Sequence, residues 1–245
     1  MRAEKQDNRT TTFVCFDIES TGLNPQQDKV IEIGAIKVRD GKIVEHFSEL
    51  INPQIKIPTL ITNLTGIDDE MLKDADTEDK VIKRFLEFAE DYVVIGHNVK
   101  FDFSFIKTAA EKEHLSFEKK GIDTLELCRK LHRDLDSKKL DSMCGFYDIN
   151  NGHAHRAYDD AKSTAMLYVK LCNVFFSEFP DTFSPKPLIY KVKKIQSVTN
   201  KQKNYLIDLL KYHNIEYIQS IDSLTHNQAS RWIDRIILEN GRINY

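Results

Sequence analysis

The chain is poor in cysteine and contains no long apolar run. Its four cysteines match no zinc-binding or redox spacing, and each lies in an apolar pattern. They are therefore predicted to be reduced thiols in the core of a cytoplasmic protein. No apolar run approaches the roughly 20 residues that a membrane-spanning helix needs. The polar residues 1–11 contain no apolar signal core, so we expect a short disordered leader there and no membrane partner.

The chain has little net charge, but that charge is unevenly distributed. The net charge is −3, yet residues 190–245 contain nine Lys and Arg against five Asp and Glu. This tail therefore carries +4 and the remaining 189 residues carry −7. A basic tail on an acidic body is typical of a chain that holds a polyanion. The alternative is a small solvated domain that binds no polyanion.

Hydrophobic periodicity predicts an α/β domain followed by a small helical one. Expected strands cover residues 13–19, 30–38, 43–50, 92–95 and 121–124. The first three form an antiparallel meander, and alternating helices and strands follow. This order predicts a mixed five-stranded sheet flanked by helices, with the first and fourth strands at its centre.

Three prolines between positions 180 and 187 predict a linker. We therefore expect a main domain over residues 12–179, a linker over residues 180–194 and a small basic helical domain over residues 195–245. In the small domain, the segments that begin at Thr199 and Thr225 both match the capping-box pattern of a helix start.

Two acids lie within the first predicted strand. Asp17 and Glu19 are two positions apart, so on a strand they point to the same face. Like charges on one side of a buried strand repel each other and lose hydration, so they need a cation such as a divalent metal ion. The alternative is a strand end at which both acids are solvated.

Two further segments supply acids. Asn98 and Asp102 are four apart, so a helix that begins here places both on one face, directed at Asp17 and Glu19. Asn98 also suits a helix cap, whereas Asp102 lies among phenylalanines and needs a partner. Asp160 falls in the first turn of a long helix predicted over residues 158–176.

A histidine precedes Asp160 by five positions. On a continuous helix His155 and Asp160 would point about 140° apart, so a shared site requires His155 to lie in the loop before the helix. His153 is the rival candidate base, and Asp159 is expected to be solvated.

The four acids Asp17, Glu19, Asp102 and Asp160 have no evident structural reason to gather. Two divalent cations about 4 Å apart can bind such a group and clamp a phosphodiester for attack by water. Histidine titrates near working pH, so His155 is the candidate base for that water. Mg²⁺ or Mn²⁺ suits an all-oxygen site, whereas zinc favours more His or Cys.

Three segments resemble the signature motifs of the DEDDh exonucleases, in family order: Phe-Asp-Ile-Glu-Ser-Thr-Gly-Leu, His-Asn-Val-Lys-Phe-Asp and His-Arg-Ala-Tyr-Asp-Asp-Ala. This family includes the proofreading epsilon subunit of bacterial DNA polymerase III and the exonuclease insert of Gram-positive replicative polymerases. The resemblance covers about residues 12–176. It implies a ribonuclease H-like fold and metal-dependent 3′→5′ hydrolysis to nucleoside 5′-monophosphates, so residues 12–179 are the expected exonuclease domain.

The resemblance also implies residue roles. By position, Asp17, Glu19, Asp102 and Asp160 match the metal-binding acids and His155 matches the general base. Tyrosine-type members would have Tyr at position 156, where Arg stands. The segment from Leu64 resembles the part that lines the terminal nucleotide. The implied contacts to that nucleotide are Thr21, Leu64, Thr65, Asn98 and Phe101, although Leu64 and Phe101 also suit plain core packing.

The leading hypothesis is a 3′→5′ exonuclease that acts on DNA 3′ ends in replication proofreading or repair. A second is the same chemistry on RNA, because contact with a 2′-hydroxyl depends on pocket geometry. A third is a non-catalytic adaptor of the replication machinery. The tail resembles small helical appendages of replication and recombination proteins from Firmicutes and their phages. It would dock a replication or repair protein, or anchor single-stranded DNA through Lys191, Lys193, Lys194, Lys201 and Lys203.

Overall fold

The computed structural model describes residues 9–152, 155–192, 196–216 and 220–243. The expected leader falls mostly outside these ranges. The chain divides into two compact units, Met1–Val192 and Lys193–Tyr245. All four cysteines are buried, as predicted. No described helix is both long enough and apolar enough to cross a lipid bilayer.

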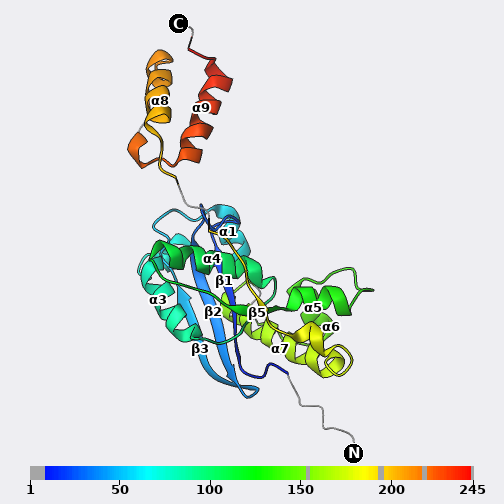
Figure 1. The fold of residues 1–245 in the computed structure, drawn as a ribbon. Helices are drawn as coiled ribbons and strands as arrows, with labels where there is room; N and C mark the ends of the chain where they lie inside the picture. The colour runs from blue at the N-terminus through cyan, green and yellow to red at the C-terminus, as the bar shows by residue number, and fades with distance from the viewer. Residues whose placement is uncertain (1–8, 153–154, 193–195, 217–219, 244–245) are drawn as a thin grey trace, which may run out of the picture. The chain divides into compact units, whose positions relative to one another are not determined.

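A mixed sheet of six strands forms the centre of the first unit (Figure 1). The strand order is β3-β2-β1-β4-β5-β6, so β1 and β4 lie at the centre as predicted. β1 pairs antiparallel with β2 and parallel with β4. The strands are β1 Phe13–Ser20, β2 Val30–Arg39, β3 Lys42–Leu50, β4 Val94–Gly96, β5 Lys120–Asp123 and β6 Lys186–Pro187.

The sixth strand corrects both the expected strand number and the expected linker. β6 pairs antiparallel with the edge of β5. Phe183, in a short 3₁₀ helix, and Leu188 are both buried in the core of this unit. Prolines are tolerated on an edge strand because one side of it makes no ladder hydrogen bonds. The proline-rich segment therefore closes the sheet edge, and the first unit extends to Val192.

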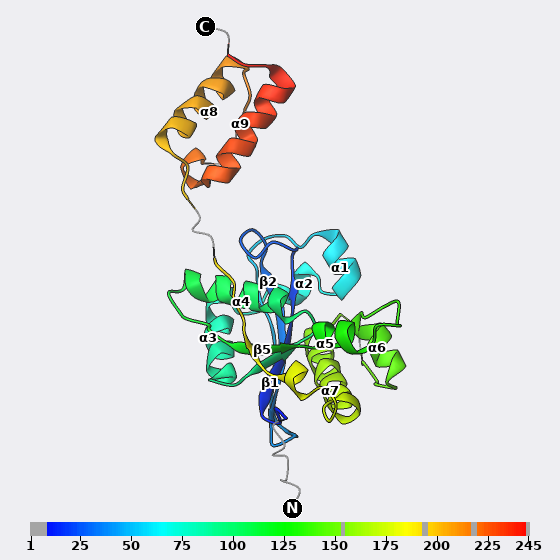
Figure 2. The same cartoon turned by 45° about the vertical axis from the view of Figure 1, so that its right-hand side comes forward.

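Helices cover both faces of the sheet (Figure 2). One hydrophobic core joins the sheet to α3 and α4, and a second core on the other face joins it to α5, α6 and α7. α1 was not predicted, because its leucines are exposed and it presents no apolar stripe. The helices are α1 Thr59–Thr65, α2 Asp69–Leu72, α3 Glu78–Ala89, α4 Val99–Lys112, α5 Thr124–Leu131, α6 Leu140–Phe146 and α7 Ala157–Phe175.

The second unit contains α8, Asn200–Tyr212, and α9, His226–Asn240. Both predicted capping boxes form: the Thr199 hydroxyl accepts from the backbone N–H of Gln202, and Thr225 does the same for Gln228. Leucine and isoleucine side chains of both helices form a core of their own.

Candidate active site

The alternation of side chains along β1 determines which face of the sheet carries its two acids. Phe13 and Cys15 belong to the core on the α7 side, whereas Val14, Phe16 and Ile18 belong to the core on the α3 and α4 side. Because side chains alternate along a strand, Asp17 and Glu19 continue the first series. Both acids therefore lie on the face that α7 covers, just beyond the end of its hydrophobic core.

A glycine on β2 lets α7 come close to these acids. Gly34 pairs with Asp17 across the sheet. A Cβ atom at Gly34 would lie 2.0 Å from the backbone nitrogen of Tyr158, in the first turn of α7. No larger residue fits without moving the helix. The contact brings Asp160, in the same part of α7, toward the acids of β1.

Asp102 approaches from the other face through an opening in the sheet. Among the described residues, β4 pairs with β1 only at Val14 and Cys15, and no strand pairs with β1 beyond Cys15 on this side. The backbone N–H of Ile18 instead donates to Oδ1 of Asp102, at 3.2 Å. This bond satisfies a buried donor and places the Asp102 carboxylate at the centre of the sheet, next to Asp17.

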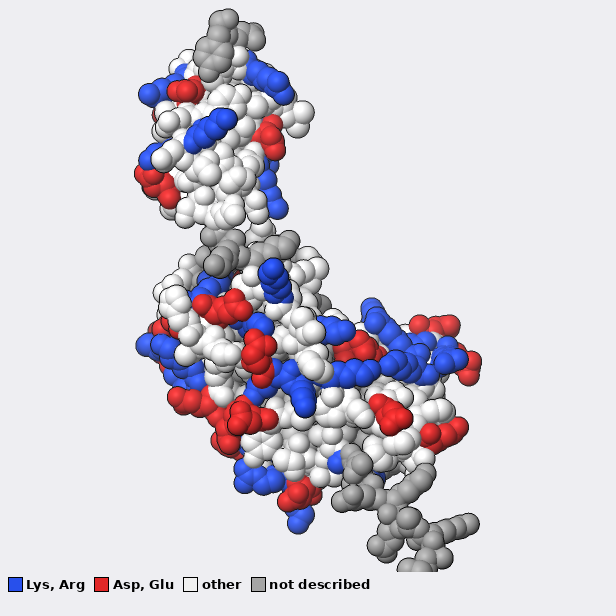
Figure 3. Space-filling model, viewed as in Figure 1, with Lys and Arg blue, Asp and Glu red and all other residues white. Residues whose placement is uncertain are grey.

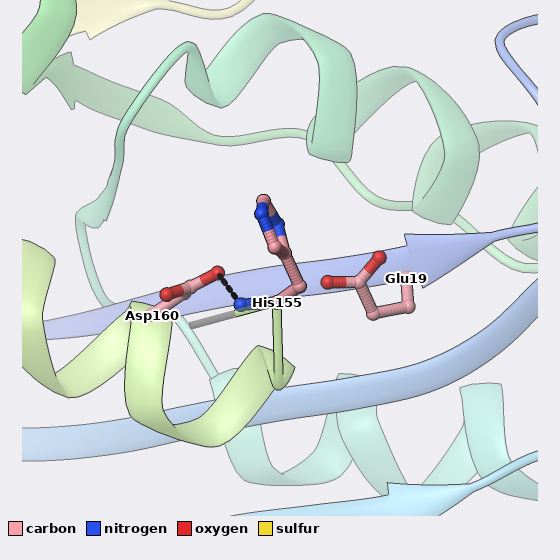
Figure 4. A group of neighbouring side chains, drawn as sticks. All are labelled: Glu19, His155 and Asp160. Atoms are coloured by element: carbon pink, nitrogen blue, oxygen red, sulfur yellow. Dashed lines mark hydrogen bonds between the residues drawn. The ribbon is translucent and has the colours of Figure 1, made fainter. Parts of the chain in front are cut away.

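His155 lies in a turn before α7, as the shared-site argument required. Its backbone is left-handed, with φ +64°, and its N–H donates to Oδ2 of Asp160 at 3.2 Å. Ligand atoms of Glu19, His155 and Asp160 all lie within 4.8 Å of one another (Figure 4). The rival His153 lies outside the described residues.

The clustered acids raise one another's pKa values. Burial is the largest cause at each acid. It raises the pKa of Glu19 to about 8, and the carboxylates of Asp160, Glu32 and Asp102 add to the effect. Burial also raises the pKa of Asp102 to about 8 and that of Asp160 to about 6. The pKa of Asp17 lies well above its ordinary value through burial and then the charges of Asp102 and Asp160. The cluster thus favours positive charge, from protons or from metal ions.

We expect the metal-free protein to lose stability as pH rises. An unfolded carboxyl ionises near pH 4, whereas Glu19 and Asp102 stay protonated in the fold until about pH 8. Between these values the folded state binds more protons, so the free energy of unfolding falls with pH. Thermal melting in EDTA should show a midpoint that falls from pH 5 to pH 8, and Mg²⁺ should raise that midpoint more at pH 8 than at pH 6. An Asp102→Asn variant should flatten the EDTA curve. A wild-type melting midpoint in EDTA that does not change with pH would contradict the clustering of these acids.

Glu32 is a site residue that the sequence analysis missed. It pairs with Glu19 across β1 and β2, and it is only 1% exposed. Its carboxylate accepts from Arg156, with Nη2 at 2.8 Å, and from the backbone N–H of Ala157 at 3.0 Å. These bonds tie the first residues of α7 to β2. The signal was a lone acid inside the apolar run of residues 30–38, on the same face as Glu19.

Replacing Glu32 should loosen the start of α7. Glu32→Gln removes the charge that pairs with Arg156, which we expect to lower the free energy of unfolding by about 2 kcal/mol. It should also lower kcat by about 10-fold, because small displacements of catalytic groups are costly. Urea unfolding and turnover on an oligonucleotide measure both quantities. Glu87→Gln, the same change at an exposed position of α3, is the control. Unchanged kcat in Glu32→Gln would remove Glu32 from the site.

The predicted nucleotide contacts divide into two kinds. Leu64 is 53% exposed and Phe101 is half-buried beside Phe105, so both can still receive a ligand. The hydroxyl of Thr21 instead accepts from the backbone N–H of Lys29 at 2.9 Å. The hydroxyl of Thr65 donates to the Ile61 carbonyl at 3.0 Å. Thr21 thus stabilises its own loop, and Thr65 makes this bond within α1.

Asn98 does not share a helical face with Asp102. Its backbone is left-handed, with φ +74°, and it precedes α4 instead of lying within it. Asn tolerates this conformation, which turns the chain from β4 into the helix. Its side chain is exposed and makes no cap hydrogen bond, while its N–H donates to Asp123 at 2.9 Å. The prediction of a shared face is therefore wrong. Asn98 does occupy the N-cap position of α4, as predicted, although its side chain makes no cap hydrogen bond.

Comparison with known families agrees with this geometry. The model of the RNase T family, described as exonucleases, matches residues 14–168, which is more than half of the chain. The chain belongs to this exonuclease family. The predicted membership of the DEDDh-type 3′→5′ exonucleases is thereby confirmed, and with it the ribonuclease H-like fold.

Curated relatives include PolC-type DNA polymerases III. The protein of Caldanaerobacter subterraneus subsp. tengcongensis is 49% identical over 159 residues, which cover 65% of this chain and 11% of the relative. That of Listeria monocytogenes is 32% identical over 240 residues, which cover 93% of this chain and 17% of the relative. The chain thus spans only a small part of these polymerases.

Solved structures share the exonuclease fold. Escherichia coli exonuclease I with single-stranded DNA, in a zinc-bound form, has a TM-score of 0.62 at 18% identity, covering 70% of this chain and 42% of that one. Exonuclease X with 5′-overhanging duplex DNA has a TM-score of 0.56 at 24% identity, covering 70% and 99%. A 3′-exonuclease that recognises a histone mRNA stem-loop has a TM-score of 0.57 at 20% identity, covering 68% and 84%.

Proposed function

We propose that this exonuclease removes nucleotides from the 3′ ends of DNA, in replication proofreading or repair, and releases nucleoside 5′-monophosphates. The observation that supports it best is the convergence of Asp17, Glu19, Asp102 and Asp160 beside His155. The polymerase relatives favour DNA as the substrate. The presence of all four acids and the histidine argues against a non-catalytic adaptor.

The donor set fits two Mg²⁺ or Mn²⁺ ions. Asp17, Glu19, Asp102 and Asp160 offer only carboxylate oxygens, which these ions prefer, and their raised pKa values show how strongly the cluster favours positive charge. Bound there, the ions would supply charge stabilisation for the phosphodiester and lower the pKa of the attacking water.

The protein's own groups provide position and proton transfer. The bond from the His155 N–H to Asp160 fixes the turn that carries the imidazole. The ring lies next to the carboxylates of Glu19 and Asp160 (Figure 4), where it takes the proton of a water that attacks phosphorus. The bond from phosphorus to the upstream O3′ then breaks. The exposed Leu64 and half-buried Phe101 are proposed to contact the terminal nucleotide.

Substrate choice is tested with matched oligonucleotides. We expect a 5′-labelled single-stranded DNA 20-mer to be shortened from its 3′ end faster than the RNA of the same sequence, in Mg²⁺ and in Mn²⁺. Faster cleavage of RNA would select the exoribonuclease, and no cleavage of either polymer would select the adaptor.

For the second unit, we propose one of the two roles predicted from its sequence, an anchor for single-stranded DNA or a docking site for a replication or repair protein. Of the lysines considered for DNA, Lys193 and Lys194 lie outside the described residues. Lys203 forms an ion pair with Asp222, whereas Lys201 is exposed.

A further inference from the structure

A pocket of about 800 Å³ opens directly beside the candidate active site. His155 and Asp160 form one part of its wall. The wall continues past His97, at the end of β4, to α5 and to the loop that precedes α6. That far part carries three cations, Arg129, Lys138 and Lys139. The pocket therefore connects the acids with a basic surface.

The cations of this surface form no ion pair with a described carboxylate. Among the residues that the structure describes, no ion pair involves Arg129, Lys130, Arg133, Lys138 or Lys139. By contrast, Lys100 on α4 pairs with Glu126. Figure 3 shows Lys and Arg side chains in a band over the part of this face where α5 and α6 lie. In a body of net charge −7, unpaired cations beside the active site are suited to a polyanion.

His97 holds the basic loop in place. Its Nε2 lies 2.8 Å from the carbonyl oxygen of Lys138, and its Nδ1 lies 2.9 Å from the hydroxyl of Thr124. Since a carbonyl oxygen can only accept, Nε2 carries the proton. The Thr124 hydroxyl also lies 3.2 Å from the carbonyl oxygen of Gly96 at the end of β4. The loop is thus tied to the same strand end that leads to Asp102.

The lining also indicates what this surface contacts. Among the described lining residues there is no Phe, Tyr or Trp on which a base could stack. Asp136 and Asp141 are the acids of the far wall, and Asp141 accepts from the Asn151 side chain at 2.8 Å. Arg129 and Lys139 are exposed, whereas Lys138 is half-buried and its Nζ donates to the Leu135 carbonyl. Exposed cations without aromatic partners, such as Arg129 and Lys139, suit contacts to backbone phosphates, which carry no sequence information.

We propose that Arg129 and Lys139 bind backbone phosphates of the substrate strand upstream of the nucleotide being removed. This inference rests on the proposed function, which places the 3′ end of that strand at the acids. These contacts would place the upstream part of the strand along α5 and keep it bound between successive cleavages.

The double variant Arg129→Ala/Lys139→Ala tests this surface with two substrates. One is a single-stranded DNA 20-mer. The other is the p-nitrophenyl ester of thymidine 5′-monophosphate, which has no upstream phosphate. We expect KM for the 20-mer to rise by about 10-fold. The slope of log(1/KM) against log salt should become shallower by about 1.4, since each lost single-strand contact accounts for about 0.7. Turnover of the ester should stay unchanged.

The control is Lys162→Ala/Lys170→Ala, which removes two exposed cations of α7. A wild-type KM and salt slope in the Arg129/Lys139 variant would overturn the proposed surface. Equal losses on the ester and the 20-mer would overturn it too, because they would give these residues a role in shaping the acid cluster. If the wild-type protein cleaves neither substrate, the proposed function itself fails, and this inference fails with it.

Discussion

Asp17→Asn should lower kcat on single-stranded DNA by about 1000-fold or more, since charge stabilisation at the reacting phosphate is the largest catalytic contribution of such a site. Burial raises the pKa of Asp17, and the charges of Asp102, Asp160, Glu19 and Glu32 raise it further, so Asp17 lies where their fields overlap. Removing its charge would take away one of the four carboxylates that are proposed to hold the metal ions.

The same variant should be more stable than wild type when metal is absent. With one carboxylate fewer, the repulsion within the cluster falls, and a relief of about 1 kcal/mol would raise the melting temperature in EDTA by about 2–4 °C. Most substitutions destabilise a protein. A higher melting temperature in Asp17→Asn would therefore indicate that the carboxylates of the cluster repel one another. Asp74→Asn, the same change at an exposed position, should alter neither kcat nor melting temperature. Full activity in Asp17→Asn would remove this acid from the site.

His155→Asn should lower kcat by about 10²–10⁴-fold with little change in KM, the range expected for loss of a general base. Asn is chosen because it tolerates the left-handed backbone at this position, where φ is +64°. The variant therefore loses the imidazole and keeps the turn. Since the adjoining pocket is about 800 Å³, free imidazole should restore part of the rate.

A matched control exists for this change. His114 also has a left-handed backbone, with φ +57°, and is exposed. His114→Asn makes the same chemical change outside the acid cluster and should leave kcat at the wild-type value. If His155→Asn kept more than about one third of the wild-type rate, well short of the loss expected without a general base, the proton would leave the water by another route.

Strand and helix periodicity predicted the parts of this site that depend on local geometry. The two-residue spacing of Asp17 and Glu19 placed them on one face of β1, and the five-residue spacing to Asp160 placed His155 before α7. In both cases the side-chain direction follows from one element alone. The three motifs also predicted the family, which the family model confirms.

The sequence does not predict features that depend on pairing between segments distant in the chain. Glu32 and Gly34 lie within an apolar run, and their importance appears only when the register of β1 with β2 sets them beside Glu19 and Asp17. β6 was read as linker because prolines are typical of both linkers and edge strands. Asn98 was placed on a helix that in fact begins one residue later, after a left-handed turn that helical spacing does not anticipate.

The most direct test of the central account is to identify the products of a single-stranded DNA hexamer incubated with the full chain, by mass spectrometry, in Mg²⁺ and in EDTA. We expect nucleoside 5′-monophosphates and hexamers shortened only from the 3′ end in Mg²⁺, and no products in EDTA. Internal cuts, products that carry a 3′-phosphate, or cleavage that persists in EDTA would contradict a carboxylate cluster that holds metal ions at the 3′ end of a strand.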